Sequence, residues 1–314
     1  MRIVFMGTPE FAVAPLEILM LNRAEVVAVY TQPDRAAGRG RVLVAPPVKT
    51  IAQKWGLPVY QPQTLKSGAE REVLAALKPD VVVVAAFGQI FTQAVLELPA
   101  RGFLNIHPSL LPLYRGVSPV PAAILNGDAF TGVSIMLLDR GVDTGPILAQ
   151  AAVAITDWDT TGTLTEKLSR IGGQMLLEVL PRWVRGDIAP RAQGPAAASY
   201  TRMITKQDGE IDWTRPAIDV WRRVRAYQPW PAGYTRWQGK QVKIIEAAVV
   251  PGQTDKPGRV VPLVGETAFG VETGSGILGV VRLQVEGKRV MTSGEFLRGQ
   301  RQFVGALLTG ERER

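Results

Sequence analysis

Asn105 and His107 are the first residues of this chain whose types and spacing suggest chemistry. Residues 102–107 are predicted as a short β-strand, in which alternate side chains share a face, so the amide and the imidazole are expected side by side. Pro108 then ends the strand, because proline cannot donate to a ladder. His107 is the only histidine, and there is no cysteine. Proton transfer near neutral pH is therefore expected at this imidazole, unless a carboxylate, lysine or amine is tuned toward neutrality.

A third polar side chain, Asp143, follows a different predicted strand. The apolar run 131–138 leads into Asp139-Arg-Gly-Val-Asp143-Thr-Gly145, where glycines flank the carboxylate. Open α/β sheets bind ligands where their strands end, so Asp143 is expected near Asn105 and His107. These three groups suit acyl transfer to an amine. The amide, and the imidazole when it is protonated, can stabilise the oxygen that gains charge. The carboxylate can favour the protonated imidazole and help to move the proton of the amine.

Two other kinds of site fit the sequence less well. A serine hydrolase would need Ser109 as nucleophile, but Ser109 stands two residues after His107 and outside any Gly-x-Ser-x-Gly turn. The opening strand, residues 2–6, and the following Gly7-Thr-Pro-Glu-Phe11 are typical of a dinucleotide site, yet Gly-x-Gly-x-x-Gly is missing and Glu10 would repel a pyrophosphate. A nicotinamide or flavin site is therefore not expected.

The composition excludes several classes of protein. Without cysteine there are no disulfides and no thiolate metal sites, and a single histidine excludes a His-rich zinc centre, so no metal is expected. No apolar run approaches the roughly 20 residues that span a bilayer. The chain enters a predicted strand at once, with no visible signal peptide. We expect a cytoplasmic protein without a membrane partner, and we expect a monomer because nothing demands an oligomer.

The elements that must position these side chains alternate between helix and strand. Short apolar strands are predicted at 2–6, 25–31 and 80–86. After Asp80 the last is continuously apolar, as in a parallel strand buried on both faces. Helices are predicted between them, and Thr163-Leu-Thr-Glu166 predicts a capping box at the start of a later helix. The predicted fold class is α/β, with a doubly wound, mostly parallel, Rossmann-like sheet.

A second, smaller domain is predicted from a change in pattern after Lys206. Short β segments separated by glycine and proline follow, at 241–247, 258–264, 269–272 and 277–286. This spacing favours an OB-like β-barrel. A length of 314 residues also suggests about two domains. The expected division is a catalytic domain at 1–189, a linker rich in Pro, Ala and Gly at 190–207, and the barrel at 208–314.

The net charge of +8 is shared unevenly along the chain. Residues 1–205 carry 19 basic and 16 acidic side chains, or +3, whereas residues 206–314 carry 17 and 12, or +5. A basic balance fits a polyanion such as nucleic acid, with an ordinary basic surface as the alternative. Residues 32–41 place three arginines among glycines. This loop is interpreted as an arm that orders on phosphates, with a solvated loop as the alternative.

Aromatic and basic side chains crowd the first part of the predicted second domain. The tryptophans are Trp213, Trp221, Trp230 and Trp237. They are interpreted as packing residues because tryptophan buries a large area, with base stacking as the alternative. The arginines Arg222, Arg223 and Arg225 are interpreted as a solvated helix face, with phosphate contact as the alternative.

Three motifs taken together resemble the 10-formyltetrahydrofolate-dependent formyltransferases. They are Asn105-x-His107, Ser109-Leu-Leu-Pro112-x-Tyr-Arg-Gly116 and Asp139-x-Gly-x-Asp143-Thr-Gly145. The resemblance covers nearly the whole chain, because Gly7-Thr-Pro-Glu-Phe11, Glu210-Ile-Asp-Trp213 and Pro229-Trp-Pro231 also fit. These features separate the chain from the glycinamide ribonucleotide formyltransferases, which are shorter and lack a C-terminal barrel.

The resemblance implies a donor, an acceptor and a set of roles. The formyl donor is 10-formyltetrahydrofolate, and the acceptor is the methionine of initiator methionyl-tRNA, so folate and this tRNA are the implied partners. Asn105, His107 and Asp143 form the implied catalytic set. The residues implied to hold the folate are Ser109, Leu110, Leu111, Pro112, Phe87, Gly88, Gln89, Ile90, Asp139 and Gly141. Those expected to contact the tRNA are Arg35, Arg39, Arg41, Lys206, Arg222 and Arg223.

Two alternatives remain open. A sugar amine as acceptor would use the same chemistry, but the arginine-bearing loop and the basic second domain argue against it. A non-catalytic RNA-binding protein on an enzyme scaffold is opposed by the intact set of Asn105, His107 and Asp143.

Overall fold

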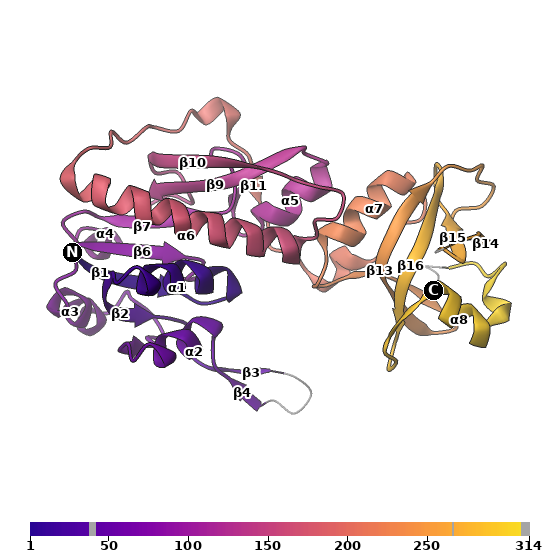
Figure 1. The fold of residues 1–314 in the computed structure, drawn as a ribbon, viewed down its shortest axis with the longest axis horizontal. Coiled ribbons are helices and arrows are strands. Elements are labelled where there is room, and N and C mark those ends of the chain that lie inside the picture. Colours follow the sequence, from indigo (N-terminus) through magenta and orange to yellow (C-terminus); the bar gives the residue numbers. More distant parts are fainter. Residues whose placement is uncertain (38–41, 266, 309–314) are drawn as a thin grey trace. The chain divides into compact units, whose positions relative to one another are not determined.

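The computed structural model describes residues 1–37, 42–265 and 267–308 (Figure 1). Its contacts divide the chain into two compact units. The first unit comprises Met1–Pro119, Phe130–Ala154 and Leu164–Arg202, and the second comprises Val120–Ala129, Ile155–Thr163 and Met203–Arg314. Unlike the linear division expected from the sequence, this one assigns two internal segments to the second unit. It also keeps most of the expected linker in the first unit.

Within the described ranges, the first unit is built on a seven-stranded sheet in the order β10-β9-β7-β6-β1-β2-β5. The run from β7 to β5 is parallel, whereas β7 pairs with β9, and β9 with β10, in the antiparallel sense. The strands are Arg2–Gly7 (β1), Glu25–Tyr30 (β2), Val59–Tyr60 (β5), Val81–Ala85 (β6), Phe103–His107 (β7), Phe130–Leu137 (β9) and Ile147–Ala154 (β10). The predicted doubly wound, mostly parallel sheet is confirmed.

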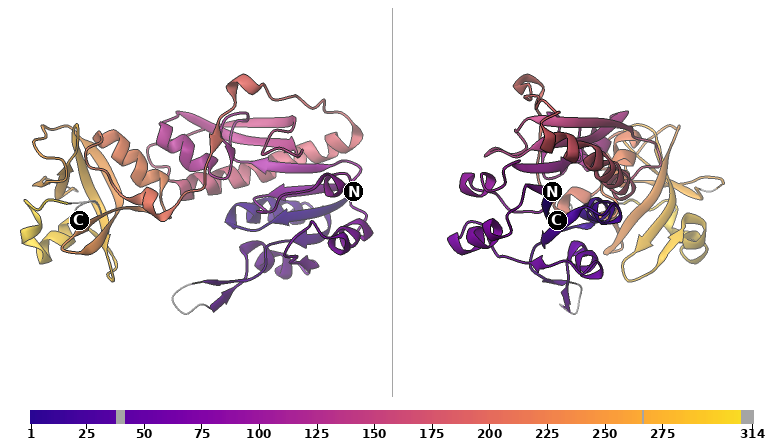
Figure 2. Two further views of the ribbon diagram at one scale, coloured as in Figure 1. Left: turned by 180° about the vertical axis from the view of Figure 1, so that it is seen from behind. Right: turned by 60° about the vertical axis from the view of Figure 1, so that its left-hand side comes forward.

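Burial of whole strands and close helix packing form the core of this unit. Every residue of β6 and β7 is buried, as expected of strands covered on both faces. The helices are Val13–Leu21 (α1), Pro47–Lys54 (α2), Gly68–Ala76 (α3), Gln93–Leu96 (α4) and Thr161–Arg185 (α6). α6 runs along the sheet (Figure 2) and needs glycine to do so. A Cβ at Gly172 would lie 2.6 Å from Ile106 Cγ2, and one at Gly173 would lie 2.7 Å from Ile18 Cδ1.

The start of α6 differs from the prediction. The helix begins at Thr161, so a capping box of Thr163 and Glu166 is wrong. Thr160 and Thr163 exchange hydrogen bonds instead. The N–H of Thr160 donates to Thr163 Oγ1 at 2.9 Å, and the N–H of Thr163 donates to Thr160 Oγ1 at 3.3 Å. Thr160 takes the capping place three residues early, and the hydroxyl of Thr163 reaches back as a glutamate would.

Residues 190–202 pack along the first unit. Among them, β11 (Tyr200–Thr201) pairs in parallel with β8 (Arg115–Gly116). The hydroxyl of Ser199 accepts from the N–H of Tyr114 at 2.8 Å. The segment expected to be a linker therefore lies beside the loop that follows β7.

The arginine-bearing loop forms an antiparallel hairpin of β3 (Arg35–Ala37) and β4 (Val42–Val44), which extends away from the sheet (Figure 2). Arg39 and Arg41 lie outside the described residues. At the base of the hairpin, Lys49 Nζ pairs with Asp34 at 2.7 Å, and Gln61 Nε2 donates to Asp34 at 2.8 Å. The hydrogen bond from Gln61 and the one from Lys49 hold the pKa of Asp34 below its usual value.

Among the described residues, the second unit forms a six-stranded antiparallel sheet in the order β12-β13-β16-β15-β14, with β17 beside β16. The strands are Gly233–Trp237 (β12), Lys240–Val250 (β13), Val260–Pro262 (β14), Phe269–Glu272 (β15), Ile277–Val285 (β16) and Val290–Thr292 (β17). The helices are Pro119–Asn126 (α5), Ala217–Ala226 (α7) and Ser293–Gly299 (α8). The sheet curls into a half-barrel, which confirms a separate, smaller β domain. None of the helices in the described ranges has the length and apolar composition needed to cross a membrane.

Three of the four tryptophans between residues 213 and 237 pack in the core of the second unit. Trp213 is buried, and its Nε1 donates to Thr235 Oγ1 at 3.1 Å. Trp221 and Trp237 pack against the same core. Trp230 is 59% exposed. Packing therefore explains these side chains except for that of Trp230.

The segment 155–163 joins the second unit through Arg225 on α7. Its guanidinium donates to the carbonyl oxygens of Asp159 at 2.9 Å and of Thr156 at 2.5 Å. It also lies 4.3 Å from the centre of the Trp221 ring. These bonds explain why residues 155–163 belong to the second unit although the chain on both sides of them belongs to the first.

Candidate active site

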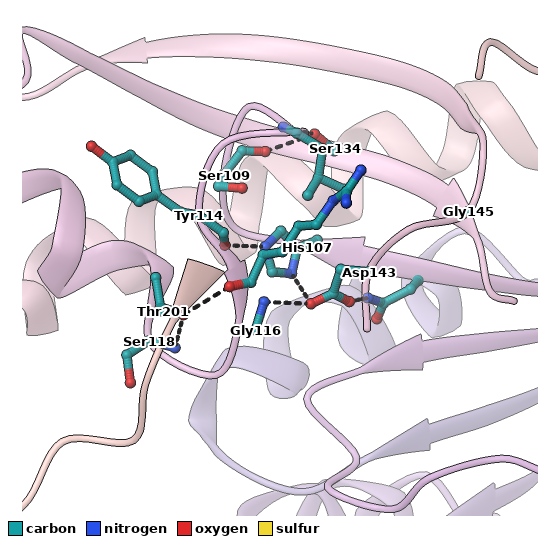
Figure 3. A network of polar contacts seen from close by, with 12 residues as sticks. His107, Ser109, Tyr114, Gly116, Ser118, Ser134, Asp143, Gly145 and Thr201 are labelled. Carbon is teal, nitrogen blue, oxygen red and sulfur yellow. Dashed lines mark hydrogen bonds and ion pairs between the residues drawn. The ribbon is translucent and has the colours of Figure 1, made fainter. Parts of the chain in front are cut away.

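Asn105, His107 and Asp143 come together in the first unit, as Figure 3 shows for the imidazole and the carboxylate. Asn105 Nδ2 lies 3.4 Å from Asp143 Oδ1, and His107 Nδ1 lies 3.6 Å from Asp143 Oδ2. The amide and the imidazole are buried, and 14% of the Asp143 side chain is exposed. One carboxylate therefore faces an amide donor and an imidazole at once.

The three residues meet by a route that the strand pattern does not predict. β7 and β9 are neighbours, but they pair antiparallel, with His107 opposite Ser134 and Leu104 opposite Leu137. The C-terminal end of β9 therefore lies beside the start of β7, at the opposite end of that strand from His107. Residues 138–146 fold back, and the loop closes where the N–H of Leu137 donates to the carbonyl of Pro146 at 2.9 Å. The returning loop, rather than a shared strand edge, brings Asp143 to the other two residues.

Several hydrogen bonds hold Asp143. Its φ is +52°, a left-handed conformation that is uncommon for residues other than glycine. The N–H of Gly116 donates to its Oδ2 at 2.8 Å. Gln193 Nε2 donates to its backbone carbonyl at 2.9 Å and to that of Gly145 at 2.7 Å. Both the backbone and the carboxylate of Asp143 are therefore fixed.

The partners of His107 define which ring nitrogen is available for chemistry. Nε2 lies 3.0 Å from the carbonyl oxygen of Tyr114. A carbonyl oxygen only accepts, so Nε2 carries a hydrogen. Nδ1 is left facing Asp143. Tyr114 itself has a φ of +57°, so a strained residue presents this carbonyl.

The predicted folate loop Ser109–Pro112 is anchored from within the protein. The Ser109 hydroxyl is buried and donates to the carbonyl of Leu113 at 2.6 Å, so it is not placed as a nucleophile. Ser134 Oγ accepts from the N–H of Leu111 at 3.0 Å and donates to the carbonyl of Ser109 at 2.7 Å. Gln150 Nε2 donates to the carbonyl of Leu111 at 2.9 Å. Leu110 and Pro112 are half-buried, and the loop forms a preformed surface.

The second predicted folate segment, Phe87–Ile90, follows β6. The buried Phe87 accepts at its carbonyl from Thr8 Oγ1 at 3.1 Å and from Gln32 Nε2 at 3.2 Å. Gly88 has a φ of +83°. The Gln89 side chain bonds to backbone groups, at 3.0 Å to each, whereas Ile90 is 75% exposed. The segment is anchored by Phe87 and Gln89 and offers Ile90 outward.

Asp139 and Gly141 shape the turn before Asp143. Asp139 Oδ1 accepts from the N–H of Gly141 at 2.9 Å and from Thr144 Oγ1 at 2.6 Å. A Cβ on Gly141 would lie 1.9 Å from Thr144 Oγ1, so the side chain of Thr144 would have to move away from Asp139. The structure places both residues in the loop that carries Asp143.

The described residues expected to contact tRNA occur in both units. Arg35 and Lys206 are exposed. On α7, Arg222 pairs with Asp219 at 3.6 Å, and Arg223 donates to a backbone carbonyl at 3.2 Å. The helix arginines are therefore engaged in protein contacts, unlike the freely solvated face expected from the sequence.

Sequence reasoning missed the residues that hold Asn105, His107 and Asp143 in place. Tyr114 and Gly116 stand in a motif that carries the family resemblance, but nothing in that motif assigned them a role. Ser134 and Gln193 carried no local signal, because their partners are distant in the sequence. Within the described ranges, no group of three or more His, Cys, Asp or Glu side chains is placed to hold a metal ion.

Comparison with known families defines the class of protein. Residues 1–180 match the formyl transferase family, and residues 203–301 match the formyl transferase C-terminal domain. The fold agrees, because a Rossmann-like sheet is followed by a separate antiparallel domain. These features define the class as a formyltransferase.

Relatives narrow this class. The methionyl-tRNA formyltransferase of Dehalococcoides mccartyi is 50% identical over 309 residues, which cover 98% of each chain. That of Chloroflexus aggregans is 51% identical over 302 residues, which cover 95% of this chain and 97% of the relative. The chain belongs to the methionyl-tRNA formyltransferase family.

Solved structures share the fold at lower identity. HypX from Aquifex aeolicus in complex with tetrahydrofolic acid matches with a TM-score of 0.64 at 19% identity, over 95% of this chain and 47% of that one. An N-formyltransferase from Helicobacter canadensis, in complex with folinic acid and dTDP-3-aminofucose, matches with a TM-score of 0.65 at 20% identity, over 88% and 97%. At these identities the likeness is one of fold alone.

Proposed function

We propose that this chain transfers a formyl group from 10-formyltetrahydrofolate to the α-amino group of methionine on initiator methionyl-tRNA. One observation carries the proposal: the Asp143 carboxylate faces the Asn105 amide at 3.4 Å and the His107 imidazole at 3.6 Å. The 50% identity to a methionyl-tRNA formyltransferase over 98% of both chains supports the acceptor. The structural neighbour in complex with tetrahydrofolic acid supports a folate donor.

The proposed reaction is a direct transfer. The α-amine attacks the formyl carbon, a C–N bond forms, and the formyl oxygen becomes an oxyanion on a tetrahedral centre. Collapse of this intermediate breaks the bond to N10 of the folate, which takes up the proton that the amine has lost. The products are formylmethionyl-tRNA and tetrahydrofolate. The Ser109 hydroxyl, which is buried and bonded to Leu113, supports a route without an acyl-enzyme.

Asn105 and His107 stabilise the oxyanion in this mechanism. The hydrogen bond from Asn105 to Asp143 is long, at 3.4 Å, and therefore weak. Little interaction energy is lost when the amide donates to a formyl oxygen instead. His107 acts as an imidazolium and donates through Nδ1, because the N–H of Nε2 is already bonded to the Tyr114 carbonyl. A preorganised donor of this kind lowers the barrier by roughly 3–4 kcal/mol. Asp143 accepts the proton of the amine, directly or through a water molecule.

The folate lies against Ser109–Pro112 and Phe87–Ile90 in this proposal. Both segments are anchored from within, so they offer a surface that does not need to order when the ligand binds. The exposed Ile90 side chain supplies an apolar contact for a flat heterocycle. Asp139 and Gly141 border the same space through the turn that carries Asp143.

The tRNA is bound by basic residues of both units in this proposal. Arg35 lies in β3, Arg39 and Arg41 belong to the arginine-bearing stretch 32–41 of the sequence, and Lys206, Arg222 and Arg223 belong to the second unit. The charge of +5 on residues 206–314 supports a polyanionic partner for that part of the chain. On binding, Arg222 would leave Asp219 and Arg223 would leave the backbone carbonyl of Asp208, and each would contact a phosphate instead.

A formyl-transfer assay tests the proposal. Initiator methionyl-tRNA, elongator methionyl-tRNA and amino-sugar nucleotides are offered as acceptors, each with 10-formyltetrahydrofolate. We expect the highest kcat/KM on initiator methionyl-tRNA. Faster transfer to an amino-sugar nucleotide would overturn the acceptor. A lack of turnover, together with no folate binding in calorimetry, would overturn the enzyme assignment in favour of an RNA-binding protein.

A further inference from the structure

Gln193 lies in the segment that the sequence predicts as a linker, yet its side chain reaches the catalytic loop. Its Nε2 donates to the carbonyl oxygens of Asp143 at 2.9 Å and of Gly145 at 2.7 Å. These carbonyls flank Thr144, so the amide clamps the turn on both sides. Asp143 needs such a clamp, because a non-glycine residue with a φ of +52° keeps this conformation only where its surroundings hold it.

The orientation of the Gln193 amide is fixed by its partners. Its Oε1 accepts from Arg115 Nε at 3.0 Å and from Arg115 Nη2 at 2.8 Å. A guanidinium only donates and a carbonyl only accepts, so a single orientation of the amide satisfies all four contacts. Turning the amide over would set donors against donors and oxygen atoms against oxygen atoms. By binding Oε1, Arg115 therefore orients the Nε2 group of Gln193 toward the turn at residues 143–145.

The environment of Arg115 is not one that packing alone favours. Its guanidinium is permanently charged and 5% exposed, and no carboxylate of the described residues lies within ion-pair distance of it. Nη1 donates to the Tyr200 hydroxyl at 2.9 Å, and the guanidinium carbon lies 5.6 Å from the centre of that ring. Burial of a charge without a counter-ion is unfavourable. An apolar side chain would fill the same space at a lower cost in folding free energy.

Arg115 stands between two residues that touch the catalytic groups directly. The carbonyl of Tyr114 accepts from His107 Nε2 at 3.0 Å, and the N–H of Gly116 donates to Asp143 Oδ2 at 2.8 Å. Through Gln193, Arg115 also reaches the backbone of Asp143. The tripeptide 114–116 therefore contacts the imidazole of His107 and the carboxylate of Asp143 directly, and it contacts the backbone of Asp143 through Gln193.

We propose that Gln193, aimed by Arg115, is a positioning residue that holds the Asp143 carboxylate toward His107 and Asn105. It touches neither the formyl donor nor the acceptor, and it acts through the backbone of Asp143. This role rests on the proposed function, because it assigns Gln193 an effect on the rate of formyl transfer.

Two substitutions separate positioning from stability. Gln193→Ala removes both bonds to the turn. Gln193→Glu removes them as well, since a carboxylate cannot donate, but it gives Arg115 a counter-ion. We expect both to lower kcat by about 10- to 100-fold with KM changed by less than about twofold. We expect Gln193→Glu to stay folded, because its ion pair with Arg115 offsets the repulsion between the carboxylate and the two carbonyl oxygens. Gln228→Ala is the matched control, because it removes an amide-to-carbonyl bond of 2.9 Å in the second unit, and it should leave kcat unchanged.

The single histidine gives a readout that does not depend on turnover. In untagged protein, the imidazole resonances in NMR report the surroundings of His107 alone. Both Gln193 variants should shift these resonances, and Gln228→Ala should not. Wild-type kcat together with unshifted resonances in folded Gln193→Glu would overturn the inference. If wild-type protein transfers no formyl group, the proposed function fails, and the resonances still decide whether Gln193 positions Asp143.

Discussion

At the scale of single residues, Asp143 carries the most constraints. It holds a left-handed backbone, accepts from Gly116 and Gln193, and faces both Asn105 and His107. A carboxylate fixed in this way does not have to be ordered when the substrates bind, which favours the role proposed for it in the reaction.

Asp143→Asn should separate charge from shape. Asparagine has nearly the same size and also tolerates a positive φ, so the free energy of unfolding should stay within about 1 kcal/mol of wild type. The amide cannot accept a proton, and kcat should fall by about 10²- to 10⁴-fold. Urea unfolding and steady-state kinetics measure the two effects. Wild-type kcat would show that the carboxylate takes no part in proton transfer.

His107→Ala should nearly abolish turnover while the fold survives. The substitution removes the only imidazole of the chain, and the loss in kcat should be about 10²- to 10⁴-fold. Circular dichroism checks the fold, and calorimetry with tetrahydrofolate checks that the donor site remains. Full activity in this variant would reject the catalytic assignment.

The sequence predicts part of the site for a physical reason. Asn105 and His107 stand out because strand periodicity places them on one face and because histidine occurs once. Gln193 could not be predicted, because it lies 50 residues from Asp143 in a stretch of Pro, Ala and Gly, and its role arises from a long-range contact. The inward bond of the Ser109 hydroxyl was likewise invisible, since serine in a loop carries no sign of direction.

At the scale of elements, the β3–β4 hairpin has a firmly bonded base. Lys49 and Gln61 bind Asp34 at that base, and Arg35 donates to Gln32 Oε1 at 3.2 Å. Gln32 in turn donates to the carbonyl of Phe87 at 3.2 Å. The root of the hairpin therefore shares a hydrogen-bond network with a segment proposed to hold folate.

Arg39→Ala should impair tRNA use far more than folate binding. Loss of one charge-assisted contact to phosphate corresponds to about 10-fold or more in kcat/KM for methionyl-tRNA. The calorimetric Kd for tetrahydrofolate should not change, and Arg71→Ala on α3 serves as an exposed arginine control. Equal losses in both measurements would show that the arginine-bearing loop is not a tRNA arm.

Elements with a strong apolar pattern were predictable, and their ends were not. The valine run of β6 fixes a buried strand whatever surrounds it. The start of α6 depends on a choice between Thr160 and Thr163, and both hydroxyls can cap a helix. The antiparallel pairing of β9 with β7 had no local signal either, because strand direction is decided by the connections between strands rather than by composition.

At the scale of the whole molecule, acid should unfold the protein through carboxylates in both units. Hydrogen bonds lower the pKa values of four of the described side chains: Asp34, Asp212, Glu272 and Glu295. A carboxyl group whose pKa is lower in the folded protein than in the unfolded one stabilises the fold at pH values above its unfolded pKa. That contribution is lost as the pH falls through the folded pKa. Stability should therefore decline below about pH 4.

Glu272 offers the clearest test of this acid dependence. It is buried, and the Arg259 guanidinium, 2.7 Å away, is the main cause of its lowered pKa. Glu272→Gln should be less stable than wild type at pH 7 and should lose less stability between pH 5 and pH 3. Urea unfolding across this range measures both. An unchanged pH dependence would show that other carboxylates control acid unfolding.

The pairing of β11 with β8 bears on how the protein can be shortened. A truncated chain that stops at residue 189 would keep Asn105, His107 and Asp143 and yet lose the glutamine and the short strand that brace them. A cut after Arg202 retains this brace. The smallest piece that can preserve the catalytic architecture is thus longer than its sheet and final helix suggest.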